Sequence, residues 1–404
     1  MDFLRKAVKK LWRITPSTLQ EWGFRAACDL LLETRAHASG PEGAGPWYVV
    51  GWHRSLSGLA RAVRLAAADL RSRGEKVIGV DVTGQMLQRP YFSLDAVAAE
   101  PLATVRGRPG PGTVVVPLNP PQFQLALLLL GPKFLHGKRV VASWVWELED
   151  IPAIWRHGLA YADEVCVPSR FVREAIRRHT RKPVTLVPYR LETPRRRKSE
   201  FLADGILHCL YIFDMASDVV RKNPSAAVEA VRRAFPTGGA ELTLKVCQPG
   251  TNPAAFAKLE AVAKDAGARI VVASLSDEEL DALYCANDVY LSLHRSEGYG
   301  LTIREAMLRG LHVVATGWSG NMDFMTGGLA HPVPYELVPV QVGSRNGATC
   351  CRWAEPDIDA AAAILRDLRG ELARGRTSPQ GPGANAGHGE GVLPAADPAA
   401  GRGH

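Results

Sequence analysis

The sequence predicts an α/β protein with two doubly wound domains, each built on a parallel sheet. Short apolar runs alternate with helical stretches of ten or more residues from residue 47 onward. This alternation is typical of parallel strands joined by crossover helices. It is interrupted once, by a basic segment at residues 193–203, and then restarts. A length of 404 residues also fits two domains of ordinary size better than one core.

The first predicted domain spans residues 47–192. Residues 1–46 precede it and are expected to form one or two amphipathic helices followed by a loop rich in glycine and proline. The expected strands of this domain are the apolar runs WYVVG, KVIGVDV, TVVVPLN, RVVASWVW, EVCVPS and PVTLVPY. Polar, basic residues 193–203 then form the expected interdomain linker.

The second predicted domain spans residues 204–369. Its expected strands are ILHCLYIF, LTLKVC, RIVVAS, DVYLSLH and HVVAT. Residues 370–404 are rich in glycine, proline and alanine, with little to bury, so we expect a disordered tail. Two such domains face each other across a cleft at the carboxyl ends of their strands, where open α/β sheets bind ligands.

Composition excludes several classes of protein. The apolar fraction of 46% and the charged fraction of 22% are those of an ordinary globular protein. The longest apolar run, residues 125–131, is far shorter than the ~20 residues that span a bilayer. The seven cysteines show no metal-ligand spacing, and the N-terminus lacks a signal-peptide core, which predicts a cytoplasmic protein with reduced thiols.

The net charge of +8 favours anionic partners such as nucleotide phosphates or an acidic membrane. The arginines and lysines are spread over many predicted helices and do not form one basic stripe with interleaved aromatics. Nucleic acid is therefore not an expected partner.

The most informative segment is residues 292–324, which combines a strand, a glycine loop, a helix, a strand and a second glycine loop. Gly298 and Gly300 let the loop backbone approach a ligand closely. The unpaired N–H groups of the following helix predict an anion site. Glu297 and Glu305 frame this site. The alternative for Glu305 is a capping box with Thr302, which needs no ligand.

A second segment, residues 214–224, follows the strand ILHCLYIF. Asn223 and Pro224 are favourable cap and first-turn residues, so a helix is expected to begin beside Arg221 and Lys222. Two cations there can neutralise a departing diphosphate. The alternative is a solvated basic pair at a helix start.

These segments resemble the signature of the retaining glycosyltransferases of family four, which have the GT-B fold. The signature has two glutamates separated by seven residues, and here it consists of Glu297, Gly298, Tyr299, Gly300, Leu301, Glu305 and Ala306. The resemblance implies that Glu297 contacts the donor sugar and that Glu305 binds the ribose. The diphosphate would be bound by N–H groups around Gly300 and Leu301, beside Tyr299.

The resemblance extends over residues 49–359, to a bacterial subgroup of that family. It implies that the domain of residues 47–192 lies on the acceptor side and that the domain of residues 204–369 binds the nucleotide-sugar donor. It matches Lys222 to a phosphate-binding lysine of the family, while the family's arginine position falls on Ser217, so Arg221 must substitute. It also places Gly58 opposite the donor phosphates, and Asn321 and Asp323 where the sugar would lie. Glycine at a strand–helix turn and a turn rich in glycine and asparagine are the alternatives for these positions.

Two further motifs contain acidic residues that could belong to a site. Glu147, in WVWELE, ends a strand and is a candidate acceptor or sugar contact, whereas tryptophan packing explains its neighbours equally well. Asp357 and Asp359 form a D-x-D sequence, but Asp357 opens a predicted helix, where an acidic residue favours the helix dipole. We therefore expect no metal site and no cofactor, with the nucleotide diphosphate sugar acting as a co-substrate.

The predicted activity is a metal-independent transfer of the hexosyltransferase type, with retention of anomeric configuration. Glu297 and Lys222 are the catalytic candidates, and the acceptor is a glycan or a lipid-linked molecule in bacterial glycan or glycolipid synthesis. The alternatives are a noncatalytic nucleotide-sugar-binding partner of a transferase and a nucleotide-sugar epimerase. Residues 1–16 form an amphipathic basic pattern that predicts peripheral contact with the anionic inner face of the membrane, with packing on the first domain as the alternative.

Overall fold

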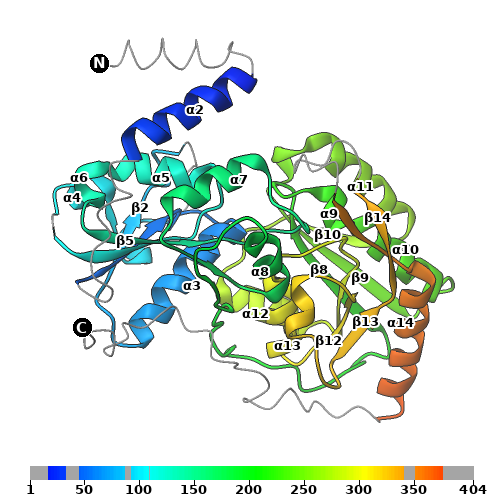
Figure 1. Cartoon of the computed structure of the whole chain (residues 1–404). Helices are drawn as coiled ribbons and strands as arrows, with labels where there is room; N and C mark the ends of the chain where they lie inside the picture. The colour runs from blue at the N-terminus through cyan, green and yellow to red at the C-terminus, as the bar shows by residue number, and fades with distance from the viewer. Residues whose placement is uncertain (1–16, 33–44, 87–91, 109, 341–350, 376–404) are drawn as a thin grey trace, which may run out of the picture.

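The computed structural model describes residues 17–32, 45–86, 92–108, 110–340 and 351–375. These residues form two parallel sheets with helices on their faces, and the two sheets lie side by side (Figure 1). The predicted α/β class with two doubly wound domains is confirmed.

The N-terminal sheet has seven parallel strands in the order β3-β2-β1-β4-β5-β6-β7. The strands are β1 (Trp47–Gly51), β2 (Val77–Asp81), β3 (Ala99–Pro101), β4 (Gly112–Val116), β5 (Lys138–Ser143), β6 (Glu164–Val167) and β7 (Val184–Leu186). Every residue of β1 and β4 is buried, as expected for central strands covered on both faces. The sequence did not reveal β3, because it has only three residues and no apolar run.

Helices cover both faces of this sheet. They are α3 (Gly58–Ser72), α4 (Leu102–Val105), α5 (Gln122–Leu130), α6 (Pro132–Leu135), α7 (Ala153–Gly158) and α8 (Arg170–Arg177). Ser57 caps α3 by accepting a hydrogen bond from the N–H of Ala60. Val63, Ala67 and Leu70 then follow helical spacing and are buried against the sheet.

The C-terminal sheet has six parallel strands in the order β10-β9-β8-β11-β12-β13. The strands are β8 (Leu207–Asp214), β9 (Ala240–Cys247), β10 (Arg269–Val271), β11 (Val289–Ser292), β12 (His312–Thr316) and β13 (Ala330–Val333). Its helices are α9 (Val219–Lys222), α10 (Pro224–Ala234), α11 (Pro253–Asp265), α12 (Asp277–Cys285), α13 (Leu301–Leu308) and α14 (Ile358–Ala373). The sequence did not reveal β13.

A small antiparallel hairpin, β14 (Tyr335–Pro339) and β15 (Arg352–Pro356), was also not predicted. Its residues follow the second sheet in sequence, yet Val340, Cys351 and Trp353 belong to the hydrophobic core of the N-terminal domain. Trp353 is fully buried there. The hairpin therefore joins the second half of the chain to the core of the first.

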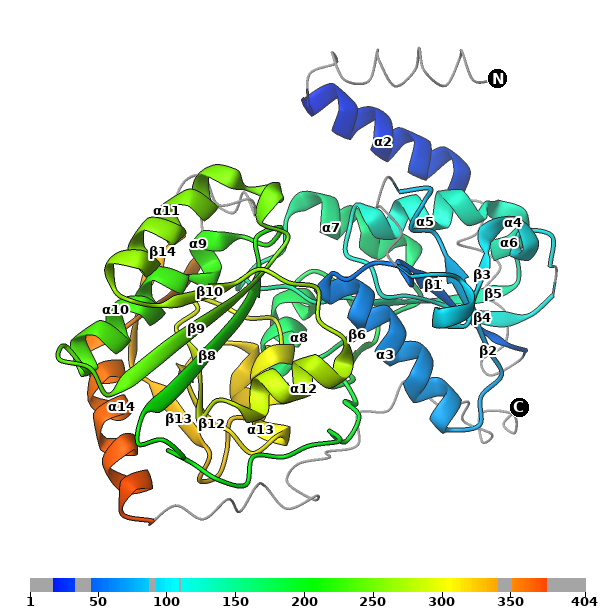
Figure 2. The same cartoon turned by 180° about the vertical axis from the view of Figure 1, so that it is seen from behind.

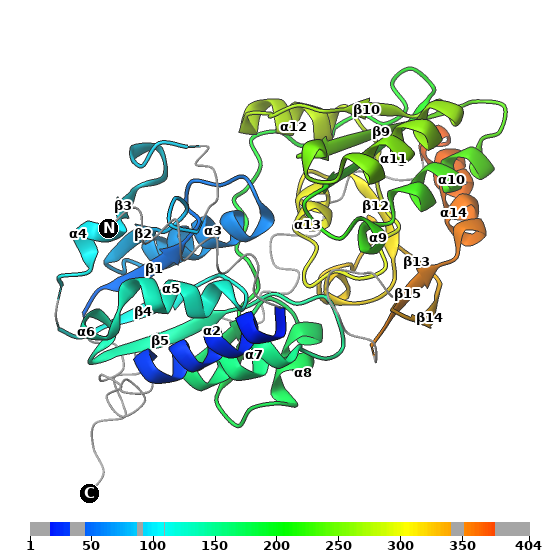
Figure 3. The ribbon, with the colours of Figure 1, turned by 90° about the horizontal axis from the view of Figure 1, so that it is seen from above.

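The segments outside the two sheets differ in part from expectation. The segment that precedes the first sheet, residues 1–46, contributes one described helix, α2 (Ser17–Leu32), which packs beside α5 (Figure 3). It is held by Asp29, which accepts hydrogen bonds from Tyr161 and pairs with His157 of α7. Residues 1–16 lie outside the described residues. Residues 193–203 contain neither helix nor strand.

Two further expectations concern the C-terminal end and the thiols. Helix α14 continues to Ala373, beyond the end predicted at residue 369, because Leu368 and Leu372 are still buried against the second core. Most of the predicted tail, residues 376–404, lies outside the described residues. The six cysteines that the structure describes form no disulfide. In the described part of the chain, no helix has the length and apolarity that crossing a membrane requires.

Candidate active site

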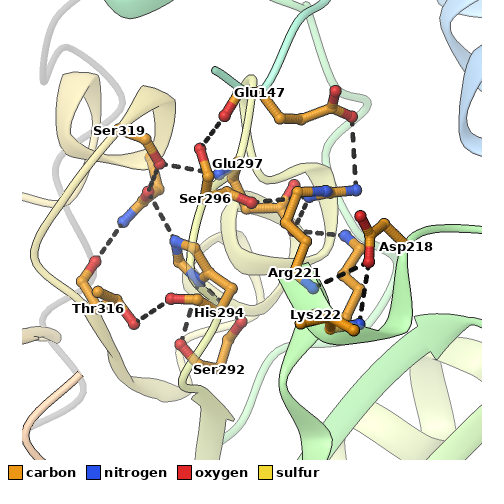
Figure 4. Close-up of polar contacts among 12 residues, drawn as sticks. Glu147, Asp218, Arg221, Lys222, Ser292, His294, Ser296, Glu297, Thr316 and Ser319 are labelled. Carbon is orange, nitrogen blue, oxygen red and sulfur yellow. Dashed lines mark hydrogen bonds and ion pairs between the residues drawn. The ribbon is translucent and has the colours of Figure 1, made fainter. Parts of the chain in front are cut away.

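The candidate site lies where three neighbouring strands of the C-terminal sheet end. Strands β8, β11 and β12 are adjacent and parallel, so the loops that follow them meet at one edge. Lys222 follows β8, Glu297 follows β11, and Ser319 follows β12. Figure 4 shows the three loops together: Ser319 accepts the backbone N–H of Glu297, and Arg221 and Lys222 lie on the other side of Glu297, with Glu147 of the N-terminal domain beside Arg221.

Lys222 and Glu297 form a direct ion pair, with the ammonium of Lys222 donating to Oε1 of Glu297. The structure thus brings together the two residues predicted to be catalytic. Both side chains are mostly buried. The Coulomb attraction within such a pair is stronger than at the surface, because little water screens it, and it offsets the cost of removing both charges from water.

Arg221 is buried, with only 4% of its surface exposed. Its Nη1 donates to the carbonyl of Ser296 at 2.7 Å and lies 3.5 Å from Glu297, while Nη2 lies 3.4 Å from Glu147. The alternative of a solvated basic pair is therefore wrong. Arg221 joins both domains through contacts with the loop that carries Glu297 and with the end of β5.

The helix start beside these cations also differs from the prediction. Arg221 and Lys222 belong to α9, a single helical turn capped by Asp218. The long helix α10 begins only at Pro224, after Asn223 in a left-handed conformation with φ of 51°. Asn223 does not cap α10 with its side chain. The turn of α9 directs both cations toward the loop after β11.

The pKa values of Glu297 and Glu147 in this cluster are shifted in opposite directions. Burial alone would raise the pKa of Glu297, but Lys222 and Arg221 together outweigh it and lower this pKa to about 2. Glu297 is therefore a stable anion. Burial also raises the pKa of Glu147 above its ordinary value, and this effect exceeds the opposing attraction of Arg221. The two carboxylates of the cluster thus differ in their hold on a proton.

The glycine loop after β11 is shaped by close backbone approaches. A Cβ on Gly298 would lie 2.8 Å from the carbonyl oxygen of Trp146 and closer still to Val145, both in the N-terminal domain. Ser169 Oγ donates to the Gly298 carbonyl at 2.6 Å, which fastens the loop to the same domain. Gly300 has φ of 86° and starts α13. The helix therefore begins beside the N-terminal domain, and its first N–H groups have no partner within the helix.

Glu305 does not form a capping box with Thr302. Gly300 is the N-cap of α13, it has no side chain, and Thr302 already lies inside the helix. The Glu305 carboxylate instead accepts a hydrogen bond from Tyr284 Oη at 3.0 Å and pairs with Arg61 of α3 at 2.7 Å. It is therefore a buried acceptor at the contact between the two domains.

The remaining predicted residues occupy different environments. The amide of Asn321 is fully buried, donates to the Thr316 carbonyl at 3.0 Å and lies 3.1 Å from His294 Nε2. It therefore braces the loop rather than facing the cleft. Asp323 accepts the N–H of Arg170 at 2.7 Å, a contact between the domains.

Tyr299 is buried, with its hydroxyl 3.4 Å from the carbonyl of Tyr189. Leu301 is the first residue of α13 and is partly exposed. Gly58 opens α3, and a Cβ there would meet no atom within 4 Å. No neighbouring atom of the described chain therefore requires glycine at position 58.

Sequence reasoning missed several residues that complete the site. Arg61, Ser169 and Tyr284 contact the predicted loop and helix from distant parts of the chain. Ser296 donates to the Glu147 carbonyl. Only Ser296 carries a local signal, because it directly precedes Glu297.

The D-x-D carboxylates serve other contacts. Asp357 caps α14 through the N–H of Ala360, and Asp359 pairs with Arg233 on the surface. Among the described residues, no group of three or more histidine, cysteine, aspartate or glutamate side chains is arranged to hold a metal ion.

The fold is similar to that of solved GT-B glycosyltransferases. The structure of HepE from Anabaena with UDP and glucose superposes with a TM-score of 0.58 at 13% identity, covering 83% of this chain and 93% of that one. Sucrose-phosphate synthase from Thermosynechococcus elongatus superposes with a TM-score of 0.54 at 15% identity, covering 83% and 92%.

A third structure is longer than this chain. TarM from S. aureus superposes with a TM-score of 0.47 at 11% identity, covering 66% of this chain, which spans only half (50%) of the TarM chain. No curated protein sequence matches this chain significantly. A family model described as family 4 glycosyltransferase in conflict systems matches residues 167–377, just over half of the sequence. Sequence match, fold and the Glu297–Glu305 loop agree, and the chain belongs to the family 4 glycosyltransferases of conflict systems.

Proposed function

We propose that this glycosyltransferase moves a sugar from a nucleotide diphosphate sugar to an acceptor hydroxyl with retention of anomeric configuration. The observation that carries the proposal is the buried contact of Lys222 with Glu297 at the edge where β8 and β11 end. This contact places one cation and one anion beside the N-terminus of α13. A leaving diphosphate needs the cation, and a developing positive charge on the sugar needs the anion.

In this mechanism Lys222 and the N–H groups at the start of α13 stabilise the departing diphosphate. Glu297 contacts the donor sugar and Glu305 the ribose, and the acceptor hydroxyl attacks from the face that the diphosphate leaves. Electrostatic stabilisation and positioning supply most of the rate. Arg221 stabilises the diphosphate only through its positive charge at longer range, because its guanidinium already contacts Glu147 and the carbonyl of Ser296.

The UDP and glucose of the HepE structure make UDP-glucose a first donor to test. We propose a glycan or lipid-linked acceptor in bacterial glycan or glycolipid synthesis. The proposed location is the cytoplasm, with contact at the inner face of the membrane through residues 1–16. The chemistry assigned to Lys222 and α13 requires no metal, so EDTA is expected to leave turnover unchanged.

The test incubates the purified full chain with UDP-, GDP-, ADP- and dTDP-sugars and a panel of glycan acceptors. Release of nucleotide with a product of the donor's anomeric configuration, measured by proton NMR, supports the proposal. A product of inverted configuration would contradict the retention. An epimerised donor would indicate an isomerase, and tight binding without turnover a noncatalytic partner of a transferase.

A further inference from the structure

One ion pair in the cleft joins the two domains at the carboxylate assigned to the ribose. Arg61 lies in the first turns of α3 in the N-terminal domain, and Glu305 lies in α13 of the C-terminal domain. Their Nη2 and Oε1 atoms are 2.7 Å apart. Figure 2 shows α3 reaching toward α12 and α13 from the neighbouring domain.

Both oxygens of Glu305 are engaged in this arrangement. Oε1 pairs with Arg61, and Oε2 accepts the hydroxyl hydrogen of Tyr284 at 3.0 Å. The Glu305 side chain is only 5% exposed. A buried carboxylate left without partners is costly, so the site without ligand favours a cation at Oε1.

The two partners of Glu305 differ in their freedom to leave. Tyr284 is fully buried in the core of the C-terminal domain. The Arg61 side chain is 36% exposed and belongs to a helix of the opposite domain. A ligand that approaches Glu305 from the cleft therefore meets Arg61 first.

The position of α13 does not depend on Arg61. Arg309 donates through Nε to Asp281 of α12 at 2.9 Å and through Nη1 to the Glu305 carbonyl at 3.0 Å. These contacts fix α13 to its own domain. The pair of Arg61 with Glu305 is therefore additional to what the fold of this domain requires.

We propose that Arg61 occupies the ribose subsite before the donor binds, and that it sets the donor affinity by competing for Glu305. The proposal rests on the proposed function, in which Glu305 accepts the ribose hydroxyls. Ribose binding exchanges the Arg61 contact at Oε1 for hydroxyl donors, while Tyr284 keeps Oε2. Nucleotide binding and the domain contact at Arg61 are consequently coupled.

The test measures UDP, GDP, ADP and dTDP binding to the full chain by calorimetry. Arg61→Ala and Arg61→Gln are expected to bind the preferred nucleotide about threefold to tenfold more tightly than the wild type, because the competing cation is gone. Arg71→Ala is the matched control. It removes a positive charge from the other end of α3 and is expected to change nothing.

A double substitution separates competition from a general charge effect. In a Glu305→Gln background, Arg61→Ala should have little effect, because its partner carboxylate is absent. Unchanged or weaker nucleotide binding by both Arg61 variants would overturn the proposal while leaving the proposed function intact. If neither the wild type nor any variant binds a nucleotide, the proposed function fails and the role of Arg61 fails with it.

Discussion

At the residue scale, the neighbours of Glu297 determine its ionisation state. The carboxylate lies between Lys222 and Arg221, and its pKa of about 2 keeps it ionised throughout the physiological range. A sequence reader can identify Glu297 and Lys222 separately from their motifs. Their direct contact became visible only when the loops after β8 and β11 were placed side by side.

Loss of either member of the Lys222–Glu297 pair should lower turnover. We expect Glu297→Ala and Lys222→Ala each to reduce kcat at least about a hundredfold, because each removes a charge that stabilises the transition state. Steady-state nucleotide release measures this. Glu336→Ala, an exposed position on β14, serves as the control. Near-normal kcat of the Glu297 variant would refute its catalytic assignment.

A second residue-scale prediction concerns pH. Burial lowers the pKa of His294 to about 4, so the folded protein holds this ring neutral while the unfolded chain protonates near pH 6.5. Stability should therefore fall as the pH drops from about 6.5 toward 4. By linkage, His294 alone accounts for about 2 kcal/mol of the loss between pH 7 and 5.

Urea unfolding at pH 7 and pH 5 checks this contribution. His294→Gln should reduce the difference in unfolding free energy between the two pH values. His136→Gln, at an exposed position, should leave the difference as in the wild type. An equal difference in all three proteins would show that His294 is not responsible.

At the element scale, the glycine loop after β11 connects catalysis to the contact between domains. Gly298 packs against the backbone of Trp146, and Ser169 and Ser296 fasten the loop on either side. The sequence predicted the loop, the helix α13 and the strands around them. It assigned the glycines to a ligand, whereas Gly298 is required by the neighbouring domain.

Substitution of Gly298 should therefore affect both stability and activity. A Cβ at this position collides with Val145 and the Trp146 carbonyl, and one of the two domains must shift. We expect Gly298→Ala to lose about 1–3 kcal/mol of stability, as overpacking usually does, together with most of its turnover. Thermal melting and nucleotide release measure the two effects.

Gly328→Ala is the matched control, because a Cβ there meets no atom within 4 Å. It should behave as the wild type. A Gly298→Ala protein with unchanged melting temperature would show that the loop has room that the structure does not indicate.

At the scale of the whole molecule, the hairpin β14–β15 bridges the two domains, and helix α2 extends the N-terminal one. The hairpin contributes Trp353 to the N-terminal core, and Arg295 of the C-terminal domain donates through Nε and Nη2 to the two carboxylate oxygens of Glu355. Helix α2 adds Cys28 and Leu32 to the same core. The domains are thus joined by more than the basic linker.

The last prediction concerns residues 1–16, which precede α2 in the sequence. Residues 1–16 contain five basic residues around an apolar stripe, and each basic residue near an anionic surface adds about 1 kcal/mol of attraction. We expect the full chain to float with anionic liposomes at low salt and to be released at high salt. A chain lacking residues 1–16 should remain unbound. Equal recovery of both proteins would exclude this segment as the membrane contact.

The sequence by itself determined the class of fold, most strands and the loop from Glu297 to Glu305. These features depend on residues that are close together in the sequence, because buried parallel strands need continuous apolar runs and tight loops need glycine. Only the tertiary structure decided the partners: Arg61 for Glu305, Glu147 for Arg221, and the first core for Trp353. Such contacts depend on how the surfaces of the two domains pack against each other, and local patterns in the sequence do not determine that packing.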